Sequence, residues 1–302
     1  MAANLKRTIL NVVKPFILPY TRQKLKGFYK EEQALTRITE GNVLVLAPHV
    51  DDETIGLGGT IIEHVKKGQH VTVAYITDGS GSVSSLSKEE LMAKRKQEAK
   101  EVQQLLGFQD LVFLDLPDGA LESNEHSREL FRSLIEEKKP AFIYCPTFVD
   151  CHPDHVTTGR ILSDVLEEKQ YSGAVRMYEI NCPIPPNEIN TVIDITDAFE
   201  TKEKAVDIFQ SQAIDFDGFI ELSKIKTELV PGTNAKAVET FLEIPASEFS
   251  VQYQRVDQKK YPYNQIFKQV NKAATLIWGI LKNVDEKKRM YKERHSGQGG
   301  SI

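Results

Sequence analysis

The sequence predicts an α/β protein with a Rossmann-like, three-layer fold, in which helices cover a mostly parallel, doubly wound sheet. Short apolar, β-branched runs alternate along the chain with longer segments of helical periodicity, as repeated βαβ units require. Two of the apolar runs end in clusters of histidines and acids, at residues 49–53 and 151–155. These clusters can converge only if both strands lie parallel in one sheet, with their carboxyl ends at the same edge.

The elements follow one another regularly as far as Pro183. We predict strands over residues 42–47, 70–77, 111–114 and 141–145. We predict helices over residues 60–67, 88–106, 127–137 and 156–168, and a weaker pattern predicts one more over 197–211. The helix at residue 88 has a clear start signal, because Ser87 followed by Glu90 forms a capping box.

The composition is typical of a globular protein and argues against nucleic-acid binding. Of the 302 residues, 40% are apolar and 27% are charged. The net charge of -5 gives no general attraction for nucleic acid, so we expect no nucleic-acid partner. The three cysteines form no Cys-x-x-Cys pair, which fits a reducing compartment, and we predict a cytoplasmic protein.

The two ends of the chain differ from its centre. We divide the chain into a basic amphipathic extension, a domain with both clusters, and a helical extension with a flexible tail: residues 1–40, 41–250 and 251–302. Lys14, Pro15 and Pro19 interrupt the apolar run at the N-terminus, so it is neither a secretory signal nor a membrane span. This segment could lie on an anionic membrane surface as a peripheral contact. Alternatively, it is a helix that packs on the core with a solvated basic face.

The two clusters supply ligands for a metal. The first has the sequence His-Val-Asp-Asp-Glu and the second has Cys-His-Pro-Asp-His. A catalytic zinc usually has three protein ligands, and His49, Asp52 and His155 provide them. Other divalent ions, such as Fe²⁺, suit the same ligands. Consecutive residues of an extended chain point in different directions, so Asp51 stays off the metal and is placed to act as a base.

These two motifs resemble those of the PIG-L/LmbE family of zinc-dependent amino-sugar deacetylases. The resemblance extends over about residues 42–244 and includes Thr77-Asp78-Gly79, Arg95-x-x-Glu98, Leu114 to Gly119 and Lys202-x-x-Ala205. Its chief departure is Val50, where proline is usual, which changes the stiffness of the loop and removes no ligand. The resemblance implies zinc and the removal of acetate from an N-acetylated amino sugar, such as an N-acetylglucosaminyl glycoside or glycolipid.

The resemblance also implies roles for individual residues. The metal ligands of the family match His49, Asp52 and His155. A protonated His152 would stabilise the oxyanion and then protonate the leaving amine, while Asp154 would orient His152 and raise its pKa. Arg95 and Asp118 match positions that face the sugar. Alternatively, these two residues form a salt bridge between neighbouring loops.

Two other function classes stay open at this point. Gly56, Gly58 and Gly59 follow a strand, and Asp78 lies about twenty residues further on, as in a Rossmann-type dinucleotide-binding protein. Against this, the three acids at 51–53 would repel a pyrophosphate. A non-catalytic, metal-dependent sugar-binding module is the second alternative, although it would need neither a base nor an acid. The sequence gives no prediction of the oligomeric state.

Overall fold

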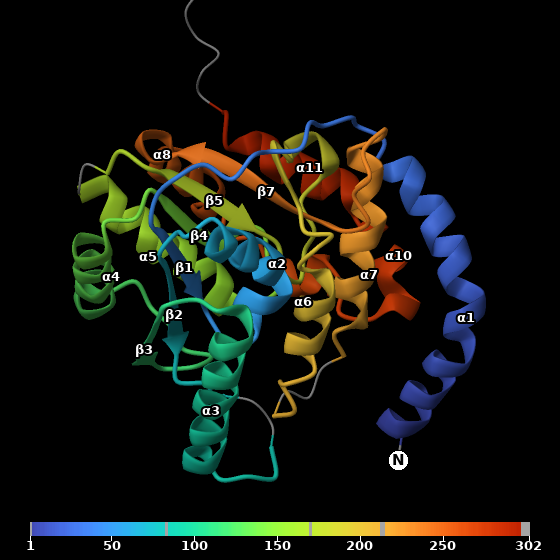
Figure 1. The fold of residues 1–302 in the computed structure, drawn as a ribbon, viewed down its shortest axis with the longest axis horizontal. Helices are drawn as coiled ribbons and strands as arrows, with labels where there is room; N and C mark the ends of the chain where they lie inside the picture. Colours follow the sequence, from blue (N-terminus) through green and yellow to red (C-terminus); the bar gives the residue numbers. More distant parts are fainter. Residues whose placement is uncertain (1, 82–83, 169–170, 212–214, 297–302) are drawn as a thin grey trace, which may run out of the picture.

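A mostly parallel sheet of seven strands forms the centre of the molecule (Figure 1). The computed structural model describes residues 2–81, 84–168, 171–211 and 215–296. The strand order is β3-β2-β1-β4-β5-β7-β6; β3 to β5 run parallel, and β7 is antiparallel to β5 and β6. The strands are β1 (Val43–Ala47), β2 (Val71–Thr77), β3 (Asp110–Leu116), β4 (Phe142–Pro146), β5 (Ala174–Tyr178), β6 (Thr191–Asp194) and β7 (Val238–Pro245).

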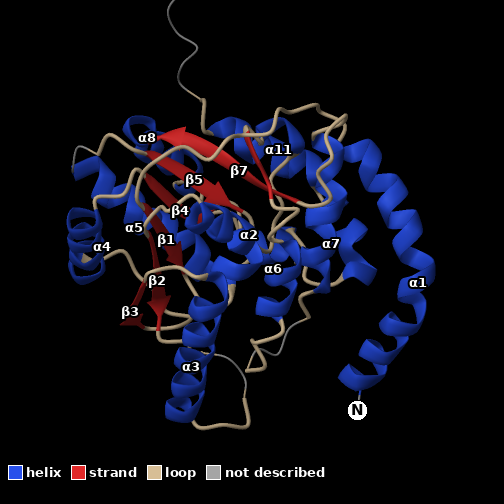
Figure 2. Ribbon diagram, viewed as in Figure 1, coloured by secondary structure: helices blue, strands red, loops and turns tan. Residues whose placement is uncertain are grey.

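Helices cover both faces of the sheet, which confirms the predicted fold class (Figure 2). α2, α3 and α6 contact one another on one face, and α5 contacts α4 and α8 on the other. The α-helices are α1 (Ala2–Phe28), α2 (Asp52–Lys66), α3 (Lys88–Leu106), α4 (Glu125–Lys138), α5 (Pro153–Glu168), α6 (Phe199–Val206), α7 (Asp217–Ile225), α8 (Ala246–Asp257), α9 (Tyr263–Ile266), α10 (Leu276–Leu281) and α11 (Val284–Glu293). Three short 3₁₀ helices are η1 (Pro186–Glu188), η2 (Lys226–Leu229) and η3 (Ala273–Thr275).

The predicted elements of the first half are present, with one shift. α2 begins at Asp52 rather than at residue 60, so the first cluster lies in the β1–α2 turn and the first turn of the helix. The helix then kinks at Leu57, which has φ −152° and ψ 23°. In the second half, α6 ends at Val206 and does not reach the predicted residue 211. The sequence did not predict β5, β6 or β7.

A buried ion pair from the second half of the chain provides hydrogen-bond partners for the backbone groups that the kink in α2 leaves unpaired. In a regular helix the N–H of Gly59 would donate to the C=O of Ile55. Instead, the carboxylate of Glu239 accepts from the N–H groups of Gly59 (3.0 Å) and Thr60 (2.7 Å). Lys202 donates to the free C=O of Ile55 (2.9 Å) and to Glu239 (2.6 Å). The kink is therefore a side-chain insertion into the helical ladder.

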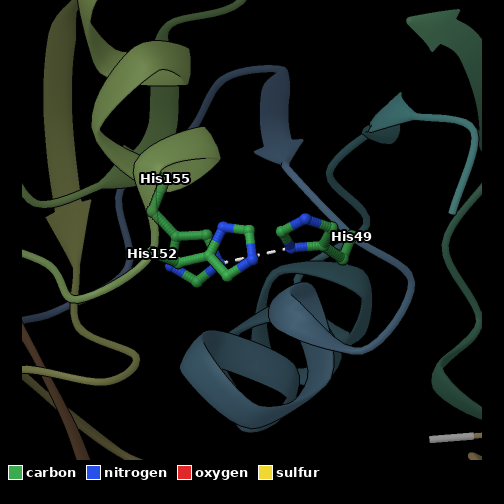
Figure 3. A group of neighbouring side chains, drawn as sticks. All are labelled: His49, His152 and His155. Atoms are coloured by element: carbon green, nitrogen blue, oxygen red, sulfur yellow. Dashed lines mark hydrogen bonds between the residues drawn. The ribbon is translucent and has the colours of Figure 1, made fainter. Parts of the chain in front are cut away.

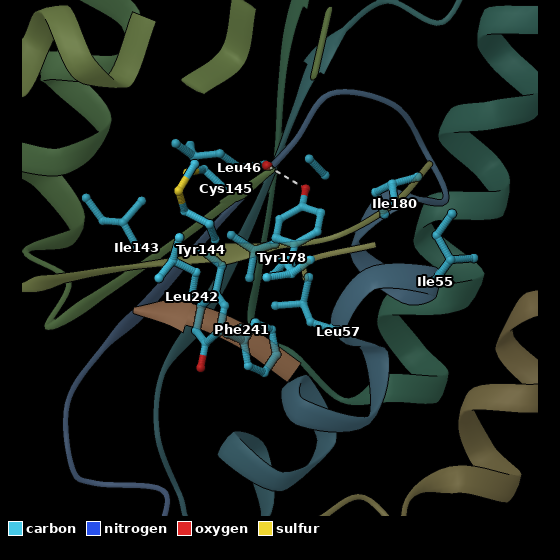
Figure 4. Packing of buried hydrophobic residues seen from close by; sticks show 14 of the residues in the cluster. Leu46, Ile55, Leu57, Ile143, Tyr144, Cys145, Tyr178, Ile180, Phe241 and Leu242 are labelled. Atoms are coloured by element: carbon cyan, nitrogen blue, oxygen red, sulfur yellow. Dashed lines mark hydrogen bonds between the residues drawn. The ribbon is translucent and has the colours of Figure 1, made fainter. Parts of the chain in front are cut away.

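Buried side chains from β1, β4, β5 and β7 pack together beneath the edge of the sheet that carries the two His/Asp clusters (Figure 4). Every residue of β1 and β2 is buried, as continuous apolar runs in parallel strands predict. Tyr178 crosses this core, and its hydroxyl donates to the C=O of Leu46 (2.8 Å). The rings of Tyr144 and Phe241 pack edge to face, with centroids 5.2 Å apart. The end of β1 is thus held by close packing on several sides.

α1 packs on the rest of the chain through ion pairs. Its basic side chains pair with acids of α7 and η2: Lys14 with Asp217 (2.5 Å), Arg22 with Glu221, and Lys26 with Glu228 (2.8 Å). This arrangement favours the packed-helix alternative for residues 14–28, because the basic side chains pair with acids of the same chain and stay partly exposed to solvent. None of the described helices is long and apolar enough to cross a membrane. The membrane contact stays a prediction.

The C-terminal extension packs against α5. The guanidinium of Arg160 donates two hydrogen bonds of 2.7 Å to the carboxylate of Asp257. The segment that follows α9 then returns to α7, where the N–H of Gly218 donates to the C=O of Asn271 (3.1 Å). The predicted boundary at residue 250 falls inside α8, and both domain boundaries stay predictions. Residues 297–302 of the predicted flexible tail lie outside the described residues.

Candidate active site

The two predicted clusters meet at the carboxyl edge of the sheet. β1 and β4 are parallel neighbours, so the loops that follow them lie together. The β1–α2 turn contributes His49, Asp51 and Asp52, and the β4–α5 turn contributes His152, Asp154 and His155. A cavity of about 230 Å³ lies between these turns, lined by all of these residues except Asp154 and also by Arg95 of α3 and Asp118 after β3.

Three side-chain atoms form a triangle in this cavity. Oδ2 of Asp52 lies 3.2 Å from Nδ1 of His49 and 3.3 Å from Nε2 of His155. The two nitrogens are 3.3 Å apart (Figure 3). Ligand atoms at about 2.0–2.1 Å from a tetrahedral zinc are separated by roughly 3.3–3.4 Å. The predicted trio is therefore a His/Asp group with the spacing that a divalent ion needs.

A carboxylate stands behind each of the two histidines. Nε2 of His49 lies 3.3 Å from Asp154 and 3.4 Å from Asp118, and Nδ1 of His155 lies 3.2 Å from Asp150. Metal-binding histidines usually have such a partner, which fixes the tautomer and the orientation of the ring. Although burial opposes it, Asp52 and Asp150 raise the pKa of His155 to about 10. Burial likewise opposes the charge on His49, yet its carboxylate neighbours raise its pKa well above the ordinary value. The site therefore attracts a cation.

Asp150 is a site residue that the sequence reasoning missed. Its buried carboxylate accepts hydrogen bonds from the backbone N–H of His152 (2.8 Å) and of Asn181 (2.9 Å). The side-chain amide of Asn181 adds a third bond of 2.8 Å. We call these contacts the Asp150–Asn181 clamp. Its signal in the sequence was an acid directly before the Cys-His-Pro-Asp-His run, but the partner after β5 could not be seen there.

Asp51 has the properties expected of a buried base. Its backbone has φ 143° and ψ −30°, a conformation that is strained for a residue other than glycine. Its side chain makes no capping bond to α2, and the residue is only 5% exposed. Burial, reinforced by the neighbouring charge of Asp52, raises its pKa well above the ordinary value. The expected desolvation of this carboxyl is thus present.

Asp154 lies close enough to His152 for its charge to raise the pKa of the imidazole, but its carboxylate makes its contacts elsewhere, and the roles expected of the two residues stay predictions. The carboxylate of Asp154 faces His49, not His152, and accepts from the N–H of Gly119 (2.8 Å). Only the backbone N–H of Asp154 reaches His152, at 3.3 Å from Nδ1. Burial and the charges of His155 and His49 lower the pKa of His152 to about 4. This pKa favours the neutral imidazole of His152 near pH 7, whereas the sequence led us to expect a protonated ring.

Arg95 and Asp118 both line the cavity and also contact each other. Nη1 of Arg95 lies 3.5 Å from Asp118 and donates to the C=O of Gly79 (2.6 Å). Asp118 also accepts from the N–H of Gly81 (2.9 Å). The salt-bridge alternative is thus present in the structure. A substrate contact is compatible with it, because both side chains border the same cavity.

The glycines after β1 serve helix packing. A Cβ atom on Gly59 would lie 2.7 Å from the side chain of Ile195, and one on Gly56 would lie 2.5 Å from the ring of Tyr178. Both glycines lie inside α2, after three acids, and not in an open loop that could approach a phosphate. The structure therefore gives no support to the dinucleotide-binding alternative.

One side chain of the cavity comes from the C-terminal extension. Gln269 lines the cavity and lies in the segment between α9 and η3. It is half-buried, and no hydrogen bond of its side-chain amide occurs within the described parts of the chain. The sequence reasoning missed it, because nothing in the local pattern points to a position so far from the motifs.

Comparison with known proteins places these features in context. Residues 44–166 match the family described as "PIG-L: GlcNAc-PI de-N-acetylase". The chain is 30% identical over 187 residues to a probable N-acetyl-alpha-D-glucosaminyl L-malate deacetylase 2 of Bacillus subtilis, covering 57% of this chain and 83% of that protein. It is 29% identical to the diacetylchitobiose deacetylase of Thermococcus kodakarensis, covering 56% of this chain and 69% of that protein. The N,N'-diacetylchitobiose deacetylase structure from Pyrococcus horikoshii superposes with a TM-score of 0.60 at 27% identity, covering 69% of this chain and 85% of that one.

Proposed function

The chain belongs to the PIG-L family, and from this membership we propose that it is a metal-dependent hydrolase that removes the acetyl group from an N-acetylated amino sugar. The substrate class is an N-acetylglucosaminyl glycoside or glycolipid, by analogy with the N-acetylglucosaminyl relatives. The observation that carries the proposal is the triangle of His49, Asp52 and His155 beside the buried carboxyl of Asp51. A metal-binding group next to a desolvated base is the pair that amide hydrolysis needs.

The proposed ligands are His49, Asp52 and His155, and the proposed ion is Zn²⁺, with Fe²⁺ suited to the same atoms. When bound, zinc would lower the pKa of a water molecule and polarise the acetyl carbonyl. The residues fit such an ion because three ligand atoms lie 3.2–3.3 Å from one another and each histidine has a carboxylate behind it.

Asp51 moves the proton in the proposed reaction. Its raised pKa makes the carboxylate a stronger base than an exposed aspartate, so it can take a proton from the attacking water. The protonated carboxyl then returns this proton to the nitrogen as the C–N bond breaks, and the free amine and acetate leave. The carboxyl group of Asp51 thereby first accepts the proton and then donates it.

His152 stabilises the oxyanion as a neutral hydrogen-bond donor. Because its Nδ1 accepts from the backbone N–H of Asp154, its proton lies on Nε2. A donor that is held in place by burial and by a backbone bond stabilises charge that develops on the carbonyl oxygen. Arg95 and Asp118 would contact sugar hydroxyls from the other side of the cavity. The cavity is smaller than most ligand pockets, so we assign it to one sugar residue, with the aglycone outside.

The test is a comparison of substrates with the metal-loaded protein. Diacetylchitobiose and N-acetylglucosaminyl malate should each be offered, and acetate and free amine should both be measured. We expect equal amounts of the two products with the wild type, and a rate of release lower by about 10²–10⁴-fold with Asp51→Asn. Metal and sugar binding without release of either product would instead identify a sugar-binding module.

Location and membrane contact form a separate part of the proposal. A cytoplasmic location is supported by three free cysteines. A peripheral contact would use the side of α1 that carries Phe16 and Tyr20, which are 81% and 54% exposed. In that case, deletion of residues 1–20 should abolish salt-sensitive cosedimentation with anionic vesicles and leave hydrolysis of a soluble substrate intact. A full-length protein that ignores vesicles would assign α1 a structural role.

A further inference from the structure

Two cysteine thiols lie in contact beside the candidate active site. Sγ of Cys151, in the turn after β4, is 3.3 Å from Sγ of Cys182, in the segment after β5. Cys182 is buried, whereas Cys151 is half-buried and borders an open cavity of about 700 Å³. One member of the pair is therefore reachable by a small solute, and the other lies directly behind it.

The pair flanks both halves of the Asp150–Asn181 clamp. Cys151 lies between Asp150 and His152 in the chain, and Cys182 directly follows Asn181. Asp150 stands behind His155, and its hydrogen bond to the N–H of His152 fixes the start of that loop. A change in the distance between the two sulfurs would therefore be transmitted to His152 and His155 through one or two residues.

We propose that Cys151 and Cys182 are a redox modification site, at which a peroxide forms a reversible disulfide that switches off the active site. In the first step the Cys151 sulfur attacks the peroxide; an S–O bond forms, the O–O bond breaks, and one water leaves. The Cys182 sulfur then attacks this sulfenic acid; the S–S bond forms, and the hydroxyl leaves as a second water with the proton of the thiol. In sum, two thiols and one hydrogen peroxide give one disulfide and two waters.

The surroundings assign the order of the two thiols. Cys151 is the attacking sulfur because it alone of the two borders the cavity. Burial raises the pKa of the Cys182 thiol, which suits a resolving partner that waits in protonated form. The charge of the buried Lys287 opposes this rise at Cys182, but burial has the larger effect.

The expected consequence is a loss of activity. A disulfide has an S–S distance of about 2.05 Å, so the two sulfurs, now 3.3 Å apart, would have to approach by about 1 Å and would draw on the two loops that carry them. Catalytic groups must be held within about 0.5 Å of their productive geometry, so a movement of this size at the clamp would disturb them. This effect on activity rests on the proposed function, whereas formation of the disulfide does not.

The experiment treats the metal-loaded protein with hydrogen peroxide, followed by a thiol reductant. In the wild type we expect a peptide cross-linked through Cys151 and Cys182, a loss of deacetylation of at least tenfold, unchanged metal content, and recovery on reduction. Cys151→Ala and Cys182→Ala should resist the loss. Cys145→Ala is the matched control, since Cys145 is a buried thiol on β4, and it should respond like the wild type.

Three outcomes would overturn the inference. Oxidation of Cys151 without a cross-linked peptide would exclude the pair. A cross-linked peptide with unchanged activity would exclude the switch. Loss of activity in both alanine variants would show that peroxide acts elsewhere. If the untreated wild type hydrolyses no substrate, the proposed function fails, and the cross-linked peptide still decides whether the modification site exists.

Discussion

The part of the chain up to α5 and the part after it contribute to the site in different ways. Most residues with proposed chemical roles follow β1, β3 or β4, because parallel strands bring their carboxyl ends to one edge. The later part supplies three supporting residues. Asn181 forms the clamp with Asp150, Gln269 borders the cavity, and Glu239 accepts hydrogen bonds at the kink of α2. The proposed chemical groups of this molecule therefore lie in local motifs, whereas their exact positions depend on contacts with residues distant in the sequence.

The largest expected effect is that of His155→Ala. Loss of one of three ligands should abolish metal binding, and activity should fall below detection, because the cation-attracting group is then incomplete. Metal content per chain, measured after purification, checks this prediction. The exposed His126 on α4 provides the control His126→Ala, which should keep its metal. Full occupancy in His155→Ala would contradict the ligand assignment.

Asp51→Asn should reduce kcat by about 10²–10⁴-fold, as expected for the loss of a general base, and should retain the metal. The substitution keeps the size of the side chain and removes its basicity. Steady-state kinetics and metal analysis of the same preparation separate the two effects. Turnover close to that of the wild type would mean that another group takes the proton.

His152→Ala should reduce kcat by about 10²–10³-fold, the usual loss for one oxyanion donor. Because burial and the neighbouring histidines lower the pKa of His152 to about 4, its proton is not the one that is lost on the basic side of the pH profile. We therefore expect a pH profile of unchanged shape in the variant. Disappearance of the basic limb would restore the protonated-acid role that the sequence suggested.

Asn181→Ala should weaken metal binding by about 10-fold, the lower end of the range for a partner one contact removed from the metal. The variant loses the 2.8 Å bond from the side-chain amide to Asp150, while the backbone bond remains. Competition with a chelator measures the affinity. The exposed Asn187 offers the control Asn187→Ala, for which no change is expected. Equal affinities would show that the backbone bonds suffice.

Gln269→Ala should have the smallest effect. If the amide binds the substrate, KM should rise about fivefold, since a hydrogen bond contributes about 1 kcal/mol, and kcat should stay unchanged. Gln265→Ala, at an exposed position on α9, is the matched control. An unchanged KM for every substrate that is hydrolysed would limit the C-terminal extension to a structural role.

The sequence was sufficient to predict the strands of the first part of the molecule and the convergence of the two motifs. Continuous apolar runs predicted β1 to β4, and the motifs at their ends placed His49, Asp52 and His155 at one edge. The start of α2 was wrong, because Gly56, Gly58 and Gly59 lower helix propensity, whereas contacts with distant residues stabilise the helix there.

The remaining features depend on tertiary structure. The lowered pKa of His152 results from burial among charged neighbours, which a motif cannot show. The positive φ of Asp51 and the partner of Asp150 likewise arise only when the loops are packed together. The ion pairs of α1 could not be predicted for the same reason, because Asp217 and Glu221 lie about two hundred positions from their basic partners in the sequence.

The kink in α2 has a consequence for the order in which the chain can assemble during synthesis. Glu239 follows Gly59 by 180 positions, so all three proposed ligands leave the ribosome before the carboxylate that satisfies the bent helix. β7 must also insert between β5 and β6, a long-range pairing of the kind that slows folding. The three proposed ligands are thus synthesised while the backbone groups at the bend of α2 still lack their partner. Only after translation past residue 239 can this part of the sheet edge take its final form.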